Sequence, residues 1–161
     1  MIKDQIEVYG GFKAWFDEEK NVYIVNVPWL GRDIEVWLSN GDYEDDNEIE
    51  ILKKTFEGFW TDKEKYLSLA QSDIKEKLLP YVATHDSGNE FLPYPKASVD
   101  DFDADYWLTS VYIIADSFGR ELQFNFHRED DEDHYEGFSV RRNLDDGHLS
   151  FDAGCVPVDI E

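Results

Sequence analysis

Three aspartates at alternate positions are the first residues whose spacing could do chemistry. Asp101, Asp103 and Asp105 match the opening of an EF-hand calcium loop. Tyr106 stands where that loop needs its turn glycine, and Tyr112 stands where it needs a bidentate glutamate. Because the motif fails at both diagnostic positions, the sequence indicates no more than weak calcium binding by these carboxylates.

Two histidines are candidates for a transition-metal site. His127 and His134 have several carboxylates between them, and imidazole with carboxylate is a ligand set that such metals accept. His127 falls on the polar side of an expected strand and His134 in an acidic loop, where solvation is the alternative interpretation. A metal-dependent enzyme around these two histidines is the third of our functional hypotheses.

No nucleophile stands in a setting that would activate it. Cys155 is the one cysteine and has no histidine near it in the sequence. A packed or unreactive thiol is therefore the better interpretation. The chain contains no Gly-Xaa-Ser-Xaa-Gly elbow, and Gly10 and Gly11 do not begin a phosphate-binding loop. The sequence therefore predicts a protein without catalytic residues or cofactor, and not an enzyme.

The net charge is the strongest feature of the composition. Lys and Arg number 15 against 37 Asp and Glu, which gives a formal charge of −22. Such a field repels nucleic-acid phosphates and anionic membranes and attracts basic proteins. High charge also keeps a protein soluble without any partner, and that alternative stays open.

A large share of the acidic residues falls into three runs, at 42–50, 100–105 and 129–136. Loops tolerate charge because they are solvated, but clusters of like charge cost stability and suggest a bound cationic surface. We predict that partner contacts come from acidic loop residues with two tyrosines as anchors, namely Asp42, Tyr43, Asp45, Asp46, Asp130, Asp131, Glu132 and Tyr135.

Hydrophobic periodicity predicts the elements that position these residues. Alternation predicts strands near 12–16, 22–27 and 33–38, and again near 121–127, 138–143 and 149–151, and a stretch that is apolar on both faces predicts a central strand at 107–115. Apolar steps of three and four between 49 and 78 predict two helices, and Asn47 with Glu50 and Thr61 with Glu64 have capping-box spacing. The order predicts an α+β fold, a mostly antiparallel sheet of three plus four strands packed against two central helices.

The chain is expected to form a single domain over residues 1–161, with room for a flexible tail at 155–161. The first residues lack the apolar run of a secretory signal, and no stretch approaches the roughly 20 apolar residues of a membrane span. One cysteine allows no internal disulfide. These features predict a cytoplasmic protein that binds neither membrane nor nucleic acid directly.

Short motifs in this order resemble a group of small bacterial domains of unknown function found in polymorphic-toxin neighbourhoods. They are Trp-Leu-Gly at 29–31, Ile-Glu-Val at 34–36 and Asp-His-Tyr-Glu-Gly-Phe at 133–138, and the resemblance covers roughly residues 12–153. In the related domains an acidic residue, a His and a Gly lie close together before the penultimate strand, whereas Tyr135 and Glu136 separate His134 from Gly137 here. Some of these domains look like immunity proteins, which implies a toxin as partner but no catalytic residue.

The first functional hypothesis is therefore a cytoplasmic immunity protein that binds and neutralises a basic bacterial toxin. Many such toxins are basic nucleases, as the resemblance implies, and an acidic protein would cover their nucleic-acid groove. The second hypothesis is a nucleic-acid mimic that inhibits a DNA- or RNA-binding enzyme. It requires carboxylates spaced like phosphates along one face of the protein.

Overall fold

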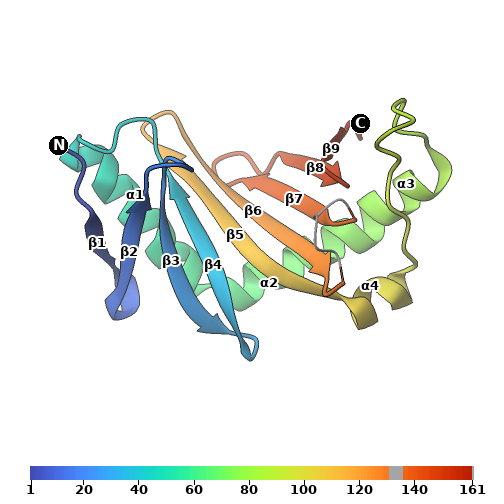
Figure 1. The fold of residues 1–161 in the computed structure, drawn as a ribbon, viewed down its shortest axis with the longest axis horizontal. Coiled ribbons are helices and arrows are strands. Elements are labelled where there is room, and N and C mark those ends of the chain that lie inside the picture. The colour runs from blue at the N-terminus through green and yellow to red at the C-terminus, as the bar shows by residue number, and fades with distance from the viewer. Residues whose placement is uncertain (131–135, 161) are drawn as a thin grey trace.

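A single twisted sheet organises the molecule, as the computed structural model of residues 1–130 and 136–160 shows (Figure 1). Among these described residues the sheet has nine strands, which lie side by side in the order of the sequence. The strands are β1 (Gln5–Val8), β2 (Phe12–Asp17), β3 (Val22–Trp29), β4 (Arg32–Ser39), β5 (Tyr106–Asp116), β6 (Gly119–Arg128), β7 (Phe138–Asn143), β8 (Leu149–Ala153) and β9 (Val156–Val158).

All neighbouring strands are antiparallel except β4 and β5, which are parallel. The exception follows from the helices between them, since a parallel pair needs a long crossover whereas an antiparallel pair closes with a short turn. The β3–β4 turn shows such a closure, because Leu30 and Gly31 both have positive φ. The predicted α+β class with a mostly antiparallel sheet is confirmed.

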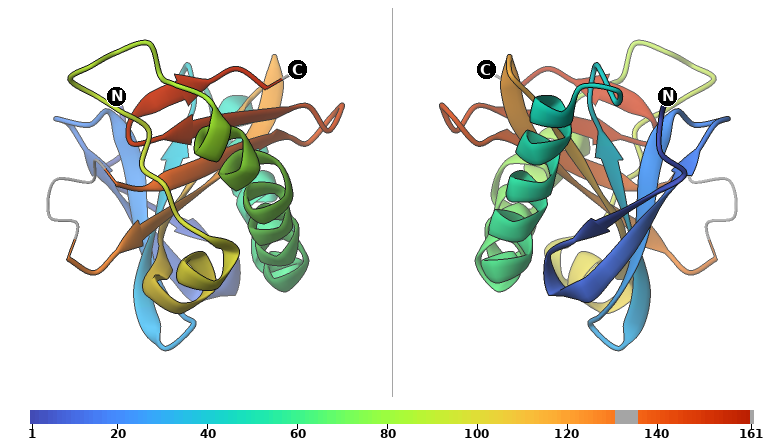
Figure 2. Two further views of the ribbon diagram at one scale, coloured as in Figure 1. Left: turned by 90° about the vertical axis from the view of Figure 1, so that its right-hand side faces the viewer. Right: turned by 90° about the vertical axis from the view of Figure 1, so that its left-hand side faces the viewer.

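The helices of the crossover form one column along one face of the sheet (Figure 2). The column contains α1 (Asp46–Thr61), α2 (Lys63–Asp73), a π-helical segment (Ile74–Leu78) and α3 (Leu79–Thr84). Pro80 lies in the first turn of α3, where its missing N–H costs little. A separate short helix, α4 (Val99–Asp105), leads into β5, and the Ser98 hydroxyl caps its first turn.

The helix boundaries differ from the expected capping boxes. Asp45 caps α1, because its carboxylate accepts hydrogen bonds from the backbone N–H groups of Asn47 and Glu48 at 2.8 and 3.3 Å. Asn47 itself lies inside the helix, and Thr61 is the last residue of α1. Several acidic side chains could each cap this end, so spacing alone selected the wrong one.

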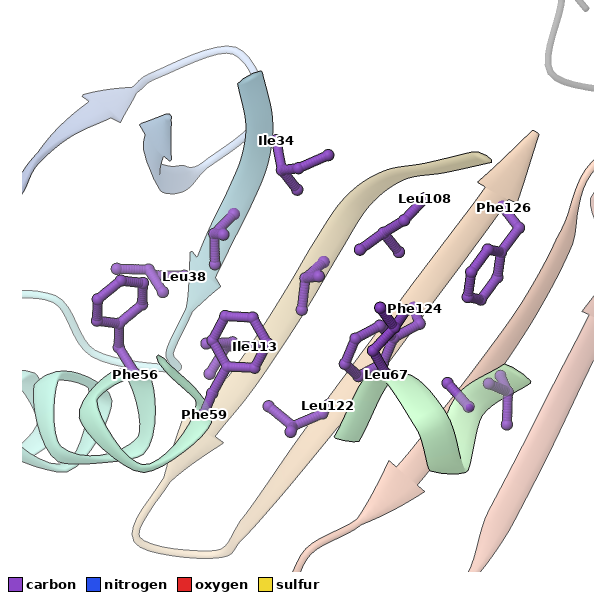
Figure 3. Close-up of a cluster of buried hydrophobic side chains, with 14 of the residues drawn as sticks. Ile34, Leu38, Phe56, Phe59, Leu67, Leu108, Ile113, Leu122, Phe124 and Phe126 are labelled. Atoms are coloured by element: carbon purple, nitrogen blue, oxygen red, sulfur yellow. The ribbon is translucent and has the colours of Figure 1, made fainter. Parts of the chain in front are cut away.

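The core fills the space between the sheet and the helix column (Figure 3). Phe56 and Phe59 from α1 point at the strands, and both are almost fully buried. Phe59 packs edge-on against Trp29 and Phe124, with ring centroids 5.9 and 6.1 Å apart. In each strand, every second residue faces the helices and makes these contacts. The residues between them point to the other face of the sheet, which no helix of the column covers.

The sheet has more strands than the periodicity indicated. Four strands precede the helices and five follow them in the described part of the chain, rather than three and four. The additional strands are the edge strands β1 and β9, which are too short for a clear alternation. β9 lies inside the stretch 155–161, for which a flexible tail was possible, and pairs with β8.

Candidate functional site

The face of the sheet that carries no helix contains a polar cleft of about 570 Å³, which we call the open-face cleft. Its walls come from five adjacent strands, β4 to β8, together with residues of three connections, Lys20, Gly137 and Cys155. The lining residues are Lys20, Glu35, Trp37, Thr109, Ser110, Tyr112, Gln123, Asn125, His127, Gly137, Ser139, Asp152 and Cys155. Strand alternation places these side chains on the face opposite the core.

Two buried amides form the floor of the cleft. Gln123 and Asn125 are only 7% and 4% exposed although no helix covers them. The Gln123 amide donates to the Asn125 side-chain oxygen at 2.8 Å, and the Ser139 hydroxyl donates to the same oxygen at 2.7 Å. Asn125 in turn donates to the Ser110 hydroxyl at 3.0 Å. These bonds fix the floor in one conformation, because breaking any of them would leave a buried polar group unpaired.

An aromatic pair forms one wall of the cleft. Trp37 and Tyr112 stack with ring centroids 4.6 Å apart and planes 22° from parallel. The Trp37 indole N–H donates to the Glu35 carboxylate at 2.8 Å. The Lys20 ammonium lies 4.8 Å from the centroid of the Trp37 ring. This wall therefore combines a π surface with a carboxylate and already attracts one cation.

A β-bulge in β5 positions the histidine of the cleft. The pairing of β5 with β6 shifts between Leu108 and Ser110, which turns the extra residue, Thr109, toward His127. The Thr109 hydroxyl lies 2.8 Å from Nδ1 of His127, within hydrogen-bond distance, and 3.2 Å from the Asn125 carbonyl oxygen. A Cβ atom on Gly137 would collide with this ring, so glycine is required there.

Two ionisable groups of the cleft are shifted by burial. Desolvation raises the pKa of Asp152, and the nearby Arg141 partly opposes this rise. Desolvation also raises the pKa of Tyr112; a hydrogen bond with Ser110 lowers it, and the charge of Glu35 adds to the rise. Perturbed ionisable groups in a cleft are typical of functional sites.

The first acidic run lies where β4 ends and α1 begins. Asp42, Asp45 and Asp46 are exposed, as expected for partner-binding residues. Tyr43, expected as an exposed anchor, is instead buried at 8% exposure. Its hydroxyl donates to the Asn21 carbonyl at 2.7 Å, and its ring packs against Phe16 and Tyr23. Tyr43 is therefore a core residue, and its ring cannot anchor a partner.

The second and third acidic runs meet at the other end of β5. α4 carries Asp101, Asp103 and Asp105 into the start of β5, and β6 ends beside it, since Tyr106 pairs with Arg128. The side chain of Arg128 lies 3.1 Å from Asp130 and 3.9 Å from Glu136. Asp130 is the main cause of its raised pKa, and Tyr106, Glu136 and Asp105 add to the rise.

We call this region the acidic end, defined by Asp100, Asp101, Asp103, Asp105, Glu129, Asp130 and Glu136. Figure 1 shows α4 and the start of α1 at opposite ends of the central strands. β5 has 11 residues, so about 30 Å separate the acidic end from the first run. Four predicted residues, Asp131, Glu132, His134 and Tyr135, lie outside the described part of the chain.

Two metal sites were considered from the sequence, a weak calcium site at 101–105 and a transition-metal site around His127 and His134. Asp101, Asp103 and Asp105 sit on a helix rather than in a loop, and Asp103 pairs with the Lys75 ammonium at 3.1 Å. Within residues 1–130 and 136–160, no three His, Cys, Asp or Glu side chains gather closely enough to hold a metal ion.

Searches among protein-family models, curated proteins and solved structures found no match to this chain. Among the described residues no helix is both long and apolar enough to span a membrane.

The open-face cleft was not identified from the sequence. The polar alternation of Gln123, Asn125 and His127 was visible and predicted a solvated strand face. The partners of this face were not visible, because Glu35, Asp152 and Cys155 come from strands and turns far apart in the chain. Cys155, which has no histidine nearby in sequence, shares the cleft with His127 in space.

Proposed function

We propose that this protein is a non-catalytic binding domain whose acidic end contacts a basic protein. Its biological form, by the resemblance of its motifs, is a cytoplasmic immunity protein that neutralises a basic bacterial toxin. The observation that carries the proposal is the meeting of two acidic runs, distant in sequence, on either side of the Arg128 guanidinium. Among the described residues Arg128, Arg32 and Lys75 pair with carboxylates of the acidic end, fewer cations than its seven carboxylates, so a cationic partner would relieve the remaining repulsion.

The acidic end also offers an aromatic anchor in place of Tyr43. Trp107 is 41% exposed and lies opposite His127 in the sheet. The Arg32 guanidinium stacks 4.2 Å from its ring and also pairs with Glu129. An exposed tryptophan whose ring is fixed by a stacked guanidinium and lies beside carboxylates is typical of a binding hot spot in a protein interface.

The first acidic run has a different role in this proposal. Asp42, Asp45 and Asp46 lie too far from the acidic end to share one small interface. Asp45 also caps α1, and Asp42 accepts a hydrogen bond from the Glu44 backbone at 3.1 Å. These residues therefore contribute to the long-range field that accelerates association and to local structure rather than to direct contact.

A capture experiment tests the proposed function. The tagged protein is used to isolate a partner from the native host, and the purified partner is titrated at low and high salt concentration. We expect a basic protein whose association rate falls steeply with salt. A bacterium that the partner alone arrests should grow when this chain is expressed with it.

Matched charge variants locate the interface. Asp101→Asn with Asp130→Asn removes two charges at the acidic end, and Asp46→Asn with Glu50→Gln removes two at the other end. We expect the first pair of substitutions to weaken binding about ten-fold and the second pair only about two-fold. Dissolved salt screens the attraction of distant charges more than that of charges in direct contact. Equal effects of the two pairs, or a neutral partner insensitive to salt, would contradict the proposal.

A further inference from the structure

The two edges of the sheet differ in whether another strand can pair with them. β1 and β9 are the outer strands, and each has one neighbouring strand in the described part of the chain (Figure 1). An edge strand presents unpaired N–H and C=O groups on its outer side, and these groups can pair with a strand of another chain. The backbone of each edge strand decides whether such pairing is possible.

The β9 edge is closed by a proline. Gly154 and Cys155 both have positive φ and form a two-residue hairpin turn. The residues that flank this turn, Ala153 and Val156, are therefore a hydrogen-bonded pair. Hydrogen-bonded and non-hydrogen-bonded pairs alternate along a strand, so the backbone of Pro157 faces outward. Because proline has no N–H, β9 lacks the donor that an incoming strand would need there.

The β1 edge, in contrast, presents complete backbone groups. The Phe16 N–H donates to the Asp4 carbonyl at 2.9 Å, which makes Asp4 and Phe16 a hydrogen-bonded pair where β1 meets β2. Because the pair types alternate, Ile6 also bonds to β2. Gln5 and Glu7 therefore direct their N–H and C=O groups to the outer side. β1 contains no proline, so this edge is open to pairing.

The sequence of β1 is complementary to itself. In an antiparallel pair with a second copy, the outward residues 5 and 7 of one copy must lie opposite the outward residues of the other. The register that uses only these residues places Gln5 opposite Glu7 of the second copy, and the two-fold axis passes beside Ile6. The Gln5 amide can then donate to the Glu7 carboxylate twice, once on each side of the axis.

The charge along β1 and β2 fits a second copy better than a basic strand. Residues 3–16 contain two cations and two anions, Lys3, Lys13, Asp4 and Glu7. Lys13 lies directly opposite Glu7 in the register. These two strands are thus balanced within a protein of net charge −22, and they lack the excess of carboxylates that attracts a cationic partner. In the self-paired register Glu7 faces the neutral Gln5, so no like charges lie directly opposite each other.

Two exposed aromatic side chains lie beside the open edge. Trp15 pairs with Gln5 across β1 and β2 and is 58% exposed. Tyr9 follows β1 directly and is 49% exposed. Exposed aromatic side chains are enriched at protein interfaces, and a second copy that pairs with β1 would approach both of them.

We propose that this protein forms a symmetric dimer in which β1 pairs antiparallel with β1 of a second copy. The two sheets become one continuous sheet, with Gln5 opposite Glu7 across the interface. This inference does not rest on the proposed function. β5, whose start lies at the acidic end, is four strands from β1, or roughly 19 Å, so the dimer leaves the acidic end free.

Sedimentation equilibrium of the whole chain tests the association. We expect a monomer–dimer equilibrium with a Kd on the order of 100 µM, since a short edge strand makes a small interface. Salt should strengthen the dimer, because it screens the repulsion between two acidic molecules, whereas it should weaken the binding of a basic partner. A monomer at all concentrations up to about 1 mM would overturn the proposal and assign this edge to a strand of another protein.

A proline at an outward position tests the strand pairing. Glu7→Pro gives β1 the feature that closes β9, and it removes an N–H that β2 does not use. This variant should weaken the dimer at least about ten-fold, whereas the matched control Glu7→Gln keeps the N–H and should change the Kd less than about three-fold. Urea unfolding checks that both variants remain folded. Equal association of the two folded variants would contradict pairing through β1.

Cross-linking tests the register without altering the backbone. Gln5→Cys and Glu7→Cys are prepared separately in the background Cys155→Ser, which removes the one native cysteine. In the proposed register, positions 5 and 7 of the two copies lie opposite each other at a Cα separation of about 5.5 Å, which suits a disulfide. Under mild oxidation the mixed variants should cross-link roughly five-fold faster than either variant alone, whose cysteines are two residues out of register. Equal rates in all three samples would overturn the proposal.

Discussion

The two faces of the same strands differ in what their side chains do. On the face toward α1 and α2, β6 presents Leu122, Phe124 and Phe126, all nearly fully buried among apolar groups. On the other face it presents Gln123, Asn125 and His127. Gln123 hydrogen-bonds to Asn125, Asn125 to Ser110, and His127 to Thr109. Changes on the helix-covered face should therefore reduce stability, whereas changes on the open face should mainly alter binding.

The largest effect is expected on the covered face. Phe59→Ala should lower the free energy of unfolding by about 3–5 kcal/mol, because it empties a site between Trp29 and Phe124. Urea denaturation measures this change. Phe118→Ala is the control, since Phe118 is 97% exposed, and it should change stability by less than about 0.5 kcal/mol. A small loss at Phe59 would contradict the assignment of this face to stability.

The ion pair between β7 and α2 on the covered face should follow. Arg142 on β7 pairs with Asp73 of α2, and Lys77 lies 3.7 Å from the same carboxylate. Arg142→Met should cost about 2 kcal/mol by urea denaturation, because Asp73 is buried and keeps only its weaker partner. Arg120→Met removes an exposed pair with Asp145 and should cost less than about 1 kcal/mol. Similar costs for the two variants would show that burial does not distinguish these pairs.

A substitution on the open face is expected to reduce stability less than one in the core. Asn125→Ala removes the centre of the amide floor and leaves Gln123, Ser139 and Ser110 each without one partner. We expect a loss of about 1–2 kcal/mol in thermal or urea unfolding. Asn26→Ala, exposed on the same face of β3, should leave stability unchanged. A loss as large as that of Phe59→Ala would remove the distinction between the faces.

The smallest effect concerns pH. Burial raises the pKa of Asp152 above its ordinary value of 3.8, so the folded protein holds this proton more tightly than the unfolded chain does. The contribution of Asp152 to stability is therefore full below the unfolded pKa and is lost as pH rises through the folded pKa. Asp152→Asn should be slightly more stable than the native protein near neutral pH, and the difference should close toward pH 3.8. Melting temperatures across this range measure it, and a difference that grows on acidification would contradict it.

Local patterns predicted much of the fold. The alternation around β6 and the apolar stripe of α1 both follow from short-range periodicity. The short edge strands β1 and β9 could not be predicted, because three or four residues give almost no periodic signal. Asp45 was missed as the cap of α1, since several neighbouring carboxylates satisfy the same local rule.

The candidate site depended on information of longer range. Tyr43 looked exposed because its sequence neighbours are charged, yet its ring fills a gap beside Phe16 and Tyr23. The open-face cleft was invisible because its carboxylates, Glu35 and Asp152, lie on strands more than a hundred residues apart in the chain. Neither error could be corrected from composition, since both concern which residues meet across the sheet.

The sequence by itself determined the charge of this protein, its fold class and the sides of β4 and β6 that face the core, because these depend on residue types and short periods. Tertiary structure alone decided where the charge acts. The antiparallel pairing of β5 with β6 brings the second and third acidic runs together, and the parallel pairing of β4 with β5 leaves the first run about 30 Å away. Strand order across the sheet likewise assembled the cleft, since contacts between distant residues are set by packing and not by local preference.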